Sequence, residues 1–251
     1  MEDYVHLHVH TNYSILDGQS KVTRLVDKAV ADGMKGMAIT DHGVMFGIKE
    51  FSDYCAKVNK GRKEKGEAPF KPVFGCEMYV ARRSMHDKDK GMHDNSGYHL
   101  IVLAKNHHGY KNLIKLVSKA WVDGYYYKPR TDREQLEKYH EDLIVCSACI
   151  AGEIPSKIIH DDIEGAREAC EWYHRVFGDD FYLELQRHEV KDPTLAANRE
   201  AYPLQQKANR VLLRFAREYG IKVICTNDCH FEDKETAEAH DHLLCLSTNE
   251  D

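Results

Sequence analysis

Short β-rich runs alternate with helical stretches along the chain, and this alternation constrains the fold more than any other feature. Seven runs have the apolar, β-branched character of strands: residues 4–9, 36–40, 71–80, 98–104, 142–148, 181–186 and 221–226. Four stretches have helical periodicity: residues 22–33, 112–121, 163–178 and 204–220. Three of these stretches end on a glycine, which is a common helix stop. Because no convincing linker interrupts the alternation, we predict one domain over residues 1–251, built as a parallel α/β barrel or wound sheet.

Composition argues against several classes of protein and indicates a metal-binding site. The formal charge of −6 argues against a nucleic-acid binder that works through a basic surface alone. No apolar run approaches the ~18 residues of a membrane span, and no signal peptide precedes the first strand-like run. The 8 cysteines show no repeated zinc-ribbon spacing, so we expect reduced thiols and a cytoplasmic location. The 16 histidines are the outlier, and they make a metal site worth seeking.

The stretch HLHVHTNYS, residues 6–14, places three histidines on alternate positions near the start of the chain. Since strand side chains alternate between faces, His6, His8 and His10 are predicted to share one face. Val5, Leu7 and Val9 are predicted to share the other. The pair His8 and His10 lies about 6.6 Å apart along a strand, which lets both rings reach one ion. We expect His6 to be a buried neighbour outside the ligand set. The alternative is that all three rings are satisfied by internal hydrogen bonds.

Further metal donors occur near the ends of the other predicted strands, where parallel α/β barrels collect their active-site residues. They are Asp17, His42, Glu77, His99, Cys149, Asp228 and His230, and Asp41 stands next to His42. His99 fits the rule poorly because it stands at the beginning of its strand. Taken singly, most such residues belong to turns or helix caps. Jointly, histidine and carboxylate donors suit Zn²⁺, Mn²⁺ or Fe²⁺, and their number suits two or three ions. Such a site would be net positive and would attract phosphate.

Five motifs together resemble the PHP family, named for polymerase and histidinol phosphatase. They are H-x-H-T (8–11), ITDHG (39–43), G-x-E-x-Y (75–79), YHL (98–100) and NDCH (227–230). Longer stretches, such as LHVHTNYSILDG and SACIAGEIP, are similar to the PHP domains at the N-terminus of bacterial DNA polymerase III alpha subunits. The resemblance implies a distorted (β/α)7, TIM-like barrel with three divalent ions, Zn²⁺ or Mn²⁺ and alternatively Fe²⁺. It also implies that the chain is an excised piece of a larger polymerase subunit.

The same resemblance implies an assignment of ligands to ions. His8, His10, Glu77 and Asp228 hold one ion in this assignment, and Asp17, His42 and His230 hold a second. His99 and Cys149 hold a third, with Glu77 as a bridge. Cys149 stands where other family members carry histidine, and it is alternatively a buried structural thiol.

The function expected from the family is metal-dependent phosphodiester hydrolysis, in the form of 3′→5′ exonuclease proofreading at a DNA primer end. Asp41 is the candidate catalytic or orienting residue. Lys128 and Arg130 are candidate phosphate contacts, with the preceding tyrosines able to stack on bases; a solvated basic loop is the alternative. Expected partners are DNA, the rest of the polymerase alpha subunit and other replisome subunits, with no membrane. Two other functions stay open: a silent metal-stabilised scaffold that docks the polymerase core or a proofreading subunit, and a phosphatase of the histidinol-phosphate type.

Overall fold

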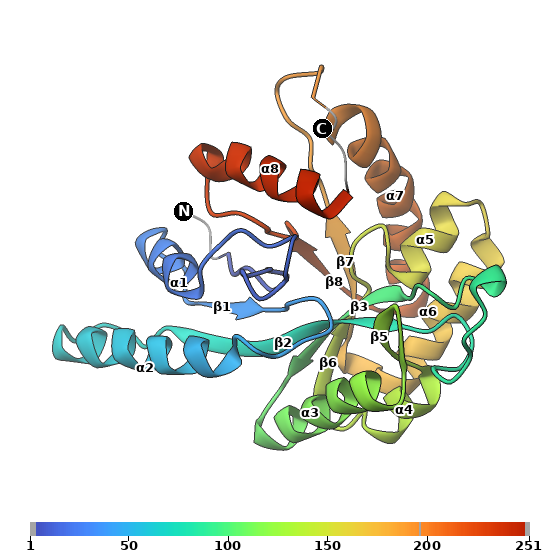
Figure 1. Ribbon diagram of the computed structural model, residues 1–251, viewed down its shortest axis with the longest axis horizontal. Coiled ribbons are helices and arrows are strands. Elements are labelled where there is room, and N and C mark those ends of the chain that lie inside the picture. Colours follow the sequence, from blue (N-terminus) through green and yellow to red (C-terminus); the bar gives the residue numbers. More distant parts are fainter. Residues whose placement is uncertain (1–3, 196, 249–251) are drawn as a thin grey trace. The chain divides into compact units, whose positions relative to one another are not determined.

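A computed structural model describes residues 4–195 and 197–248, which form two compact units. The first unit comprises residues up to Cys76 and those from Asp228 onward. Its elements are α1 (Val22–Ala31), β1 (Gly36–Ile39), α2 (Ile48–Glu64), the first part of β2 (Lys71–Val80) and α8 (Ala237–Thr248). β1 pairs in parallel with β2, from Gly36 opposite Lys71 to Ile39 opposite Phe74. Helix α1 packs on β1 and on α2 (Figure 1). In α1 the buried residues follow the spacing of one helix face: Val22, Leu25, Val26 and Ala29.

The N-terminal segment of the first unit is extended between β1 and the chain after β8, but most of it is not a regular strand. Val9 alone forms a parallel bridge, to Cys229. On one side, the Thr40 N–H donates to the Val9 carbonyl at 2.8 Å. On the other side, the His10 N–H donates to the Cys229 carbonyl at 2.7 Å. The predicted strand over residues 4–9 is therefore wrong for most of its length, because the Val9 N–H bonds the Thr40 hydroxyl instead of a carbonyl.

The second unit, Glu77 to Asn227, is built on a mixed sheet in the order β4-β5-β2-β3-β6-β7-β8. Its further strands are β3 (Tyr98–Ala104), β4 (Tyr125–Tyr126), β5 (Lys128–Thr131), β6 (Leu143–Cys146), β7 (Phe181–Gln186) and β8 (Lys222–Thr226). Its helices are α3 (His107–Val122), α4 (Arg133–Lys138), α5 (Glu153–Ile159), α6 (Ile163–Phe177) and α7 (Tyr202–Tyr219). Helix α3 packs on β3 and β6, α6 on β6 and β7, and α7 on β7 and β8 (Figure 1).

Strand direction is where the second unit departs from the expected parallel fold. The pairs β6–β7 and β7–β8 are parallel, as predicted, and β2 is also parallel to β5, a strand that was not predicted. However, β3 runs antiparallel to β6, with Ile101 opposite Cys146 and Ala104 opposite Leu143. The β4–β5 hairpin is antiparallel as well. This hairpin has strands of two and four residues, too short to give a period-2 signal in the sequence.

The other predicted elements are confirmed closely. The runs 71–80, 98–104 and 181–186 are strands over those same residues, and 36–40, 142–148 and 221–226 are strands with slightly shorter bounds. The four predicted helices are present, and Gly220 takes the left-handed conformation expected of a helix stop, with φ of 68°. All 8 cysteines are free thiols. Among the described residues, no helix is long and apolar enough to cross a membrane.

Candidate metal centre

Two histidines of the N-terminal segment converge on one carboxylate oxygen within the first unit. The side chains of His8 and His10 are fully buried. Their Nε2 atoms lie 3.0 Å and 3.2 Å from Oδ1 of Asp228. The bridge of Val9 to Cys229 fixes this register, because Cys229 directly follows Asp228. The three side chains thus present three ligand atoms around one point.

Asp17 brings two further histidines together in the same unit. Oδ2 of Asp17 lies 2.6 Å from Nε2 of His42 and 3.3 Å from Nε2 of His230. Burial raises the pKa of Asp17, but hydrogen bonds from His230 and His42 outweigh it and hold the pKa well below the usual range. Burial lowers the pKa of His230, and the two carboxylates Asp17 and Asp228 raise it above its ordinary value. Asp17 is therefore an anion at neutral pH, as a metal ligand must be.

The two groups of three adjoin through the His10 ring. This ring stacks on His230, with centroids 4.3 Å apart and planes at 19°, and it lies 4.1 Å from the His42 ring. Ligand atoms of His10, His42 and His230 all lie within 4.8 Å of one another. We call the full set the six-donor cluster: His8, His10, Asp17, His42, Asp228 and His230. Within the first unit, the structure thus brings together all the residues expected around the second ion and three of the four expected around the first, Glu77 being the exception.

Unusual backbone places two of these donors. Leu16, just before Asp17, has φ of 63°, and Asp228 itself has φ of 51°. Non-glycine residues rarely adopt this left-handed conformation, and such residues gather at functional sites. Gly18 follows Asp17, and a Cβ on it would lie 2.0 Å from the Thr11 carbonyl oxygen. The turn that carries Asp17 therefore requires glycine at this position.

A hydrogen-bond chain that the sequence prediction did not include supports His10. Nδ1 of His10 lies 3.0 Å from the Ser14 hydroxyl, and that hydroxyl donates to Oδ1 of Asp41 at 2.8 Å. Because the Ser14 proton points to Asp41, the His10 Nδ1–H donates to Ser14 and leaves Nε2 as the lone-pair donor. The only sequence signal was the Thr-x-x-Ser that follows the histidines.

Asp41 belongs to this supporting chain, where its carboxylate contacts Thr11 and Ser14. The side chain is 2% exposed, and Thr11 donates to it through both its backbone N–H and its hydroxyl. Burial raises the pKa of Asp41, and the hydrogen bonds from Thr11 and Ser14 oppose that shift. Its carboxylate therefore connects to the His10 ring through the Ser14 hydroxyl.

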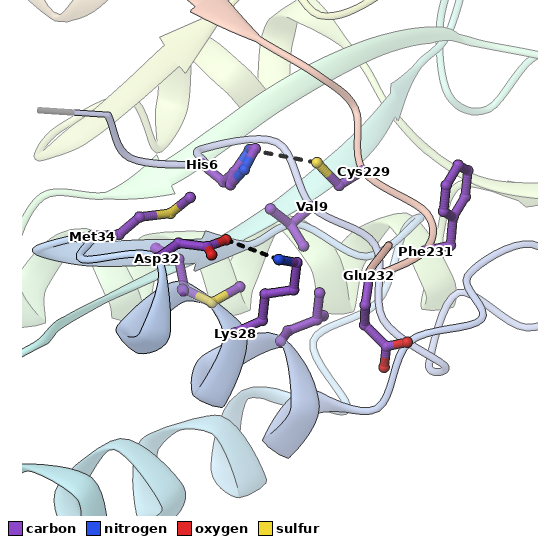
Figure 2. A pocket seen from close by; sticks show the side chains of 11 residues that line it. His6, Val9, Lys28, Asp32, Met34, Cys229, Phe231 and Glu232 are labelled. Atoms are coloured by element: carbon purple, nitrogen blue, oxygen red, sulfur yellow. Dashed lines mark hydrogen bonds and ion pairs between the residues drawn. The ribbon is translucent and has the colours of Figure 1, made fainter. Parts of the chain in front are cut away.

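His6 lies away from the six-donor cluster, which corrects the predicted face that it shares with His8 and His10. It lines a pocket of mixed polarity together with Val9, Met34 and Cys229 (Figure 2). Its Nδ1 is 3.4 Å from the Cys229 sulfur, and burial lowers its pKa. The alternation fails here because the segment before Val9 is not a regular strand. The expectation that His6 is a neighbour and not a ligand agrees with this placement.

A smaller set of donors forms within the second unit. Nδ1 of His99 lies 2.9 Å from Oε1 of Glu77 and 3.7 Å from the Cys149 sulfur. We call Glu77, His99 and Cys149 the three-donor group. The antiparallel direction of β3 accounts for the position of His99: the beginning of β3 lies beside the end of β6, which leads to Cys149. Ala148, just before Cys149, is another left-handed residue, with φ of 61°.

The two predicted phosphate contacts have different surroundings in the second unit. Lys128 is exposed, and its Nζ lies 5.4 Å from the centre of the Tyr79 ring, whose edge meets the His99 ring. Arg130 is fully buried, and its guanidinium donates to the carbonyls of Gly124 and Met85. Arg130 therefore holds the fold together and is not available to a phosphate, whereas Lys128 is.

A further histidine near the cluster was missed in the sequence. His240, on α8, packs against His230 with ring centroids 5.8 Å apart. The pair His240 and His242 repeats the H-x-H spacing, but on a helix this spacing puts the two side chains on different sides.

The donor set fits first-row divalent metals. The six-donor cluster offers four imidazoles and two carboxylates, a mixture that Zn²⁺, Mn²⁺ and Fe²⁺ accept. The three-donor group adds a softer thiol, which favours zinc at that position.

Comparisons with known proteins agree with the fold and with the motifs. A model of the PHP domain matches residues 6–188. The DNA polymerase III subunit alpha of Borreliella burgdorferi is 42% identical over 245 residues, which cover 98% of this chain and 19% of that protein. That of Treponema pallidum is 39% identical over 246 residues, with the same coverage of 98% and 19%. The chain thus spans about a fifth of the length of these relatives.

A solved structure shows the same fold at low sequence identity. It is a protein from Bifidobacterium adolescentis, provisionally named a metal-dependent phosphoesterase, with a TM-score of 0.50 and 14% identity over 97% of both chains. This likeness confirms the expected α/β fold class. Because the family model covers well over half of the residues, including the histidine-rich segment and the three-donor group, the chain belongs to the PHP domain family.

Proposed function

We propose that this chain is a metal-dependent phosphoesterase domain that removes nucleotides from the 3′ end of DNA, as part of a bacterial replicative polymerase alpha subunit. The observation that carries the proposal is the six-donor cluster, in which Asp17 and Asp228 each gather two imidazoles. Divalent ions held by such a donor set supply Lewis-acid catalysis and a nucleophile at neutral pH. The proposed partners are the rest of the polymerase alpha subunit, other replisome subunits and the DNA primer end. The proposed location is the cytoplasm.

The chain's own residues divide the work in this proposal. The cluster residues bind up to two ions, and the three-donor group binds a third, which is zinc or manganese. Ser14 and Asp41 fix the His10 tautomer so that Nε2 faces the ions. Lys128, exposed beside Tyr79, binds a phosphate of the strand through charge. No other side chain has to serve as a general base.

The proposal is tested by nucleotide release from a primer with a mismatched 3′ end, with the protein supplied with Zn²⁺ or Mn²⁺. The wild type should release the terminal nucleotide at a rate at least about 100-fold above the double variant His10→Ala, Asp228→Ala, because each change removes a ligand. Equal release by the wild type and the double variant would refute the proposed enzymatic activity. Hydrolysis of a simple phosphomonoester without release from DNA would instead indicate a small-molecule phosphatase.

A second candidate function, a docking scaffold, has one observation in its favour. Trp121, Val122, Tyr125 and Tyr127 are all exposed at the end of α3 and in the β4 hairpin that follows. Exposed apolar patches of this kind mark interaction sites. If the chain is a scaffold, it should have full metal content and release no nucleotide. The same assay, run beside elemental analysis, therefore distinguishes the scaffold function from the enzymatic one.

A further inference from the structure

A cavity in the second unit, separate from the three-donor group, combines several cationic and hydroxyl side chains. It has a volume of about 300 Å³, at the lower end of the range for small-ligand sites. Its lining includes Arg82, His93, Tyr98, Ser156, Lys157 and His160. Tyr98 immediately precedes His99, and neighbouring residues of a strand point to opposite faces. The cavity and the three-donor group therefore use opposite sides of β3.

Arg82 is held in place by an aromatic residue. Its Nη1 donates to the Tyr98 hydroxyl at 2.8 Å, and its guanidinium carbon lies 4.4 Å from the centre of the same ring. Within the described part of the chain, no carboxylate forms an ion pair with Arg82. These contacts orient the exposed guanidinium, whose other edge still offers donors. An arginine held in this way is suited to bidentate recognition of a phosphate.

Lys157, on α5, supplies a second cation with only loose acidic neighbours. Its Nζ lies 3.7 Å from Glu153 and 4.0 Å from Asp162, both longer than a hydrogen bond. Glu153 already accepts a hydrogen bond from Arg133 at 2.8 Å. The ammonium group therefore retains donors for another anion.

The one acid that lines the cavity does not cancel this charge. Asp162 accepts the Gly165 N–H at 2.9 Å as the cap of α6, so one of its oxygens is engaged by that helix. The lining of the cavity thus contains two permanently charged cations and a single carboxylate. With the hydroxyls of Tyr98 and Ser156, the cavity offers charge and neutral hydrogen-bonding groups together.

We propose that this cavity is a binding site for a phosphate group, carried either by a free nucleotide or by the backbone of a single strand of DNA. Arg82 provides paired N–H donors for two phosphate oxygens, Lys157 provides the second positive charge, and Ser156 provides a hydroxyl donor. The site requires no metal, so it stands whether or not the phosphoesterase proposal holds.

The test is binding of inorganic phosphate, dTMP and a (dT)6 oligonucleotide to the 251-residue chain by calorimetry, with and without EDTA. The double variant Arg82→Ala, Lys157→Ala should weaken binding at least tenfold. Its matched control, Lys111→Ala, Arg210→Ala, removes the same charge from exposed positions on α3 and α7 and should change binding less than twofold. Arg82→Gln, which keeps most of the side chain, should weaken binding as well. Circular dichroism checks that each variant is folded.

The relative affinities identify the source of the phosphate. Affinity for dTMP equal to that for (dT)6 indicates a free nucleotide, and a tighter, salt-sensitive affinity for (dT)6 indicates a strand. Both results support the site. Equal weakening by the variant and its control, or no binding of any probe at millimolar concentration, overturns it. Loss of nucleotide release alone, with phosphate binding intact, would count against the proposed enzyme and not against this cavity.

Discussion

The six-donor cluster and the three-donor group differ in the chemistry of their donors. In the cluster, Asp17 and Asp228 each contact two imidazoles, and Ser14 orients the His10 ring. In the three-donor group, Nδ1 of His99 lies 2.9 Å from Oε1 of Glu77 and 3.7 Å from the thiol of Cys149. The first set thus consists of imidazoles and carboxylates alone, and the second includes a thiol.

This difference is physical and has consequences for metal binding. Supporting hydrogen bonds fix the tautomer and direction of a ligand, and their loss typically weakens metal affinity by about 10–100-fold. The thiol of the three-donor group must lose its proton before it can bind an ion, so the occupancy of that group depends on pH as well as on the metal. We therefore expect the cluster to retain its ions under conditions that empty the three-donor group.

The largest expected effect is that of His10→Ala on metal content. Because His10 contacts both Asp228 and the rings of His42 and His230, its loss damages both halves of the cluster. We expect the affinity of the cluster for Zn²⁺ to fall by more than about 100-fold. Elemental analysis after dialysis against a chelator measures this.

His6→Ala is the matched control for that variant. His6 packs in the pocket with Cys229, so its removal should lower the free energy of unfolding by about 1–3 kcal/mol and leave metal content unchanged. Metal loss as severe as that of His10→Ala would show that His6 is a ligand after all.

Ser14→Ala tests whether the supporting chain accounts for the difference between the two regions. The variant leaves the His10 ring without its Nδ1 partner, so we expect the affinity of the cluster to fall by about 10–100-fold with the fold intact. Ser52→Ala, on α2, is the control and should have no effect. Unchanged affinity in Ser14→Ala would mean that packing alone orients His10.

Cys149→Ser should have a smaller effect, confined to the second unit. Serine is a poorer zinc ligand than a thiolate, so the three-donor group should lose its ion while the cluster retains its own. Titration with a zinc indicator should then show fewer bound ions than in the wild type and more than in His10→Ala. If Cys149→Ser and His10→Ala empty the protein equally, the two regions act as one site.

Much of the candidate site could be predicted from the sequence because its donors stand next to strands. His8 and His10 follow from alternation, and Asp228 and His230 follow from the strand that ends at Thr226. These are short-range patterns that a sequence displays directly. His6 was misplaced because alternation holds only in a regular strand, and its segment bonds the Thr40 side chain through Val9.

Other features depend on contacts between distant residues and leave little trace in the sequence. The antiparallel direction of β3, which explains His99, requires knowledge of its pairing with β6. Arg130 seemed to be a surface cation in a basic stretch, but it is buried, and its guanidinium donates to the carbonyls of Gly124 and Met85 in the interior. The cavity around Arg82 likewise joins residues about 75 positions apart, whose proximity no local pattern reveals.

The smallest expected effect is a difference in reactivity between two thiols, that of Cys229 beside the six-donor cluster and that of Cys149 in the three-donor group. Burial, aided by the charge of Asp228, raises the pKa of Cys229 to about 11. At pH 8 only roughly 0.1% of it is thiolate, so alkylation by iodoacetamide should be slow and should rise about tenfold per pH unit below pH 11. Cys149 should be alkylated at pH 8 in metal-free protein and protected by Zn²⁺, because a bound ion occupies its sulfur. Peptide mass spectrometry measures both rates. Alkylation of Cys229 at pH 8 as fast as that of Cys149, or labelling of Cys149 that Zn²⁺ does not slow, would contradict the assignment of Cys149 as the thiol ligand of the three-donor group.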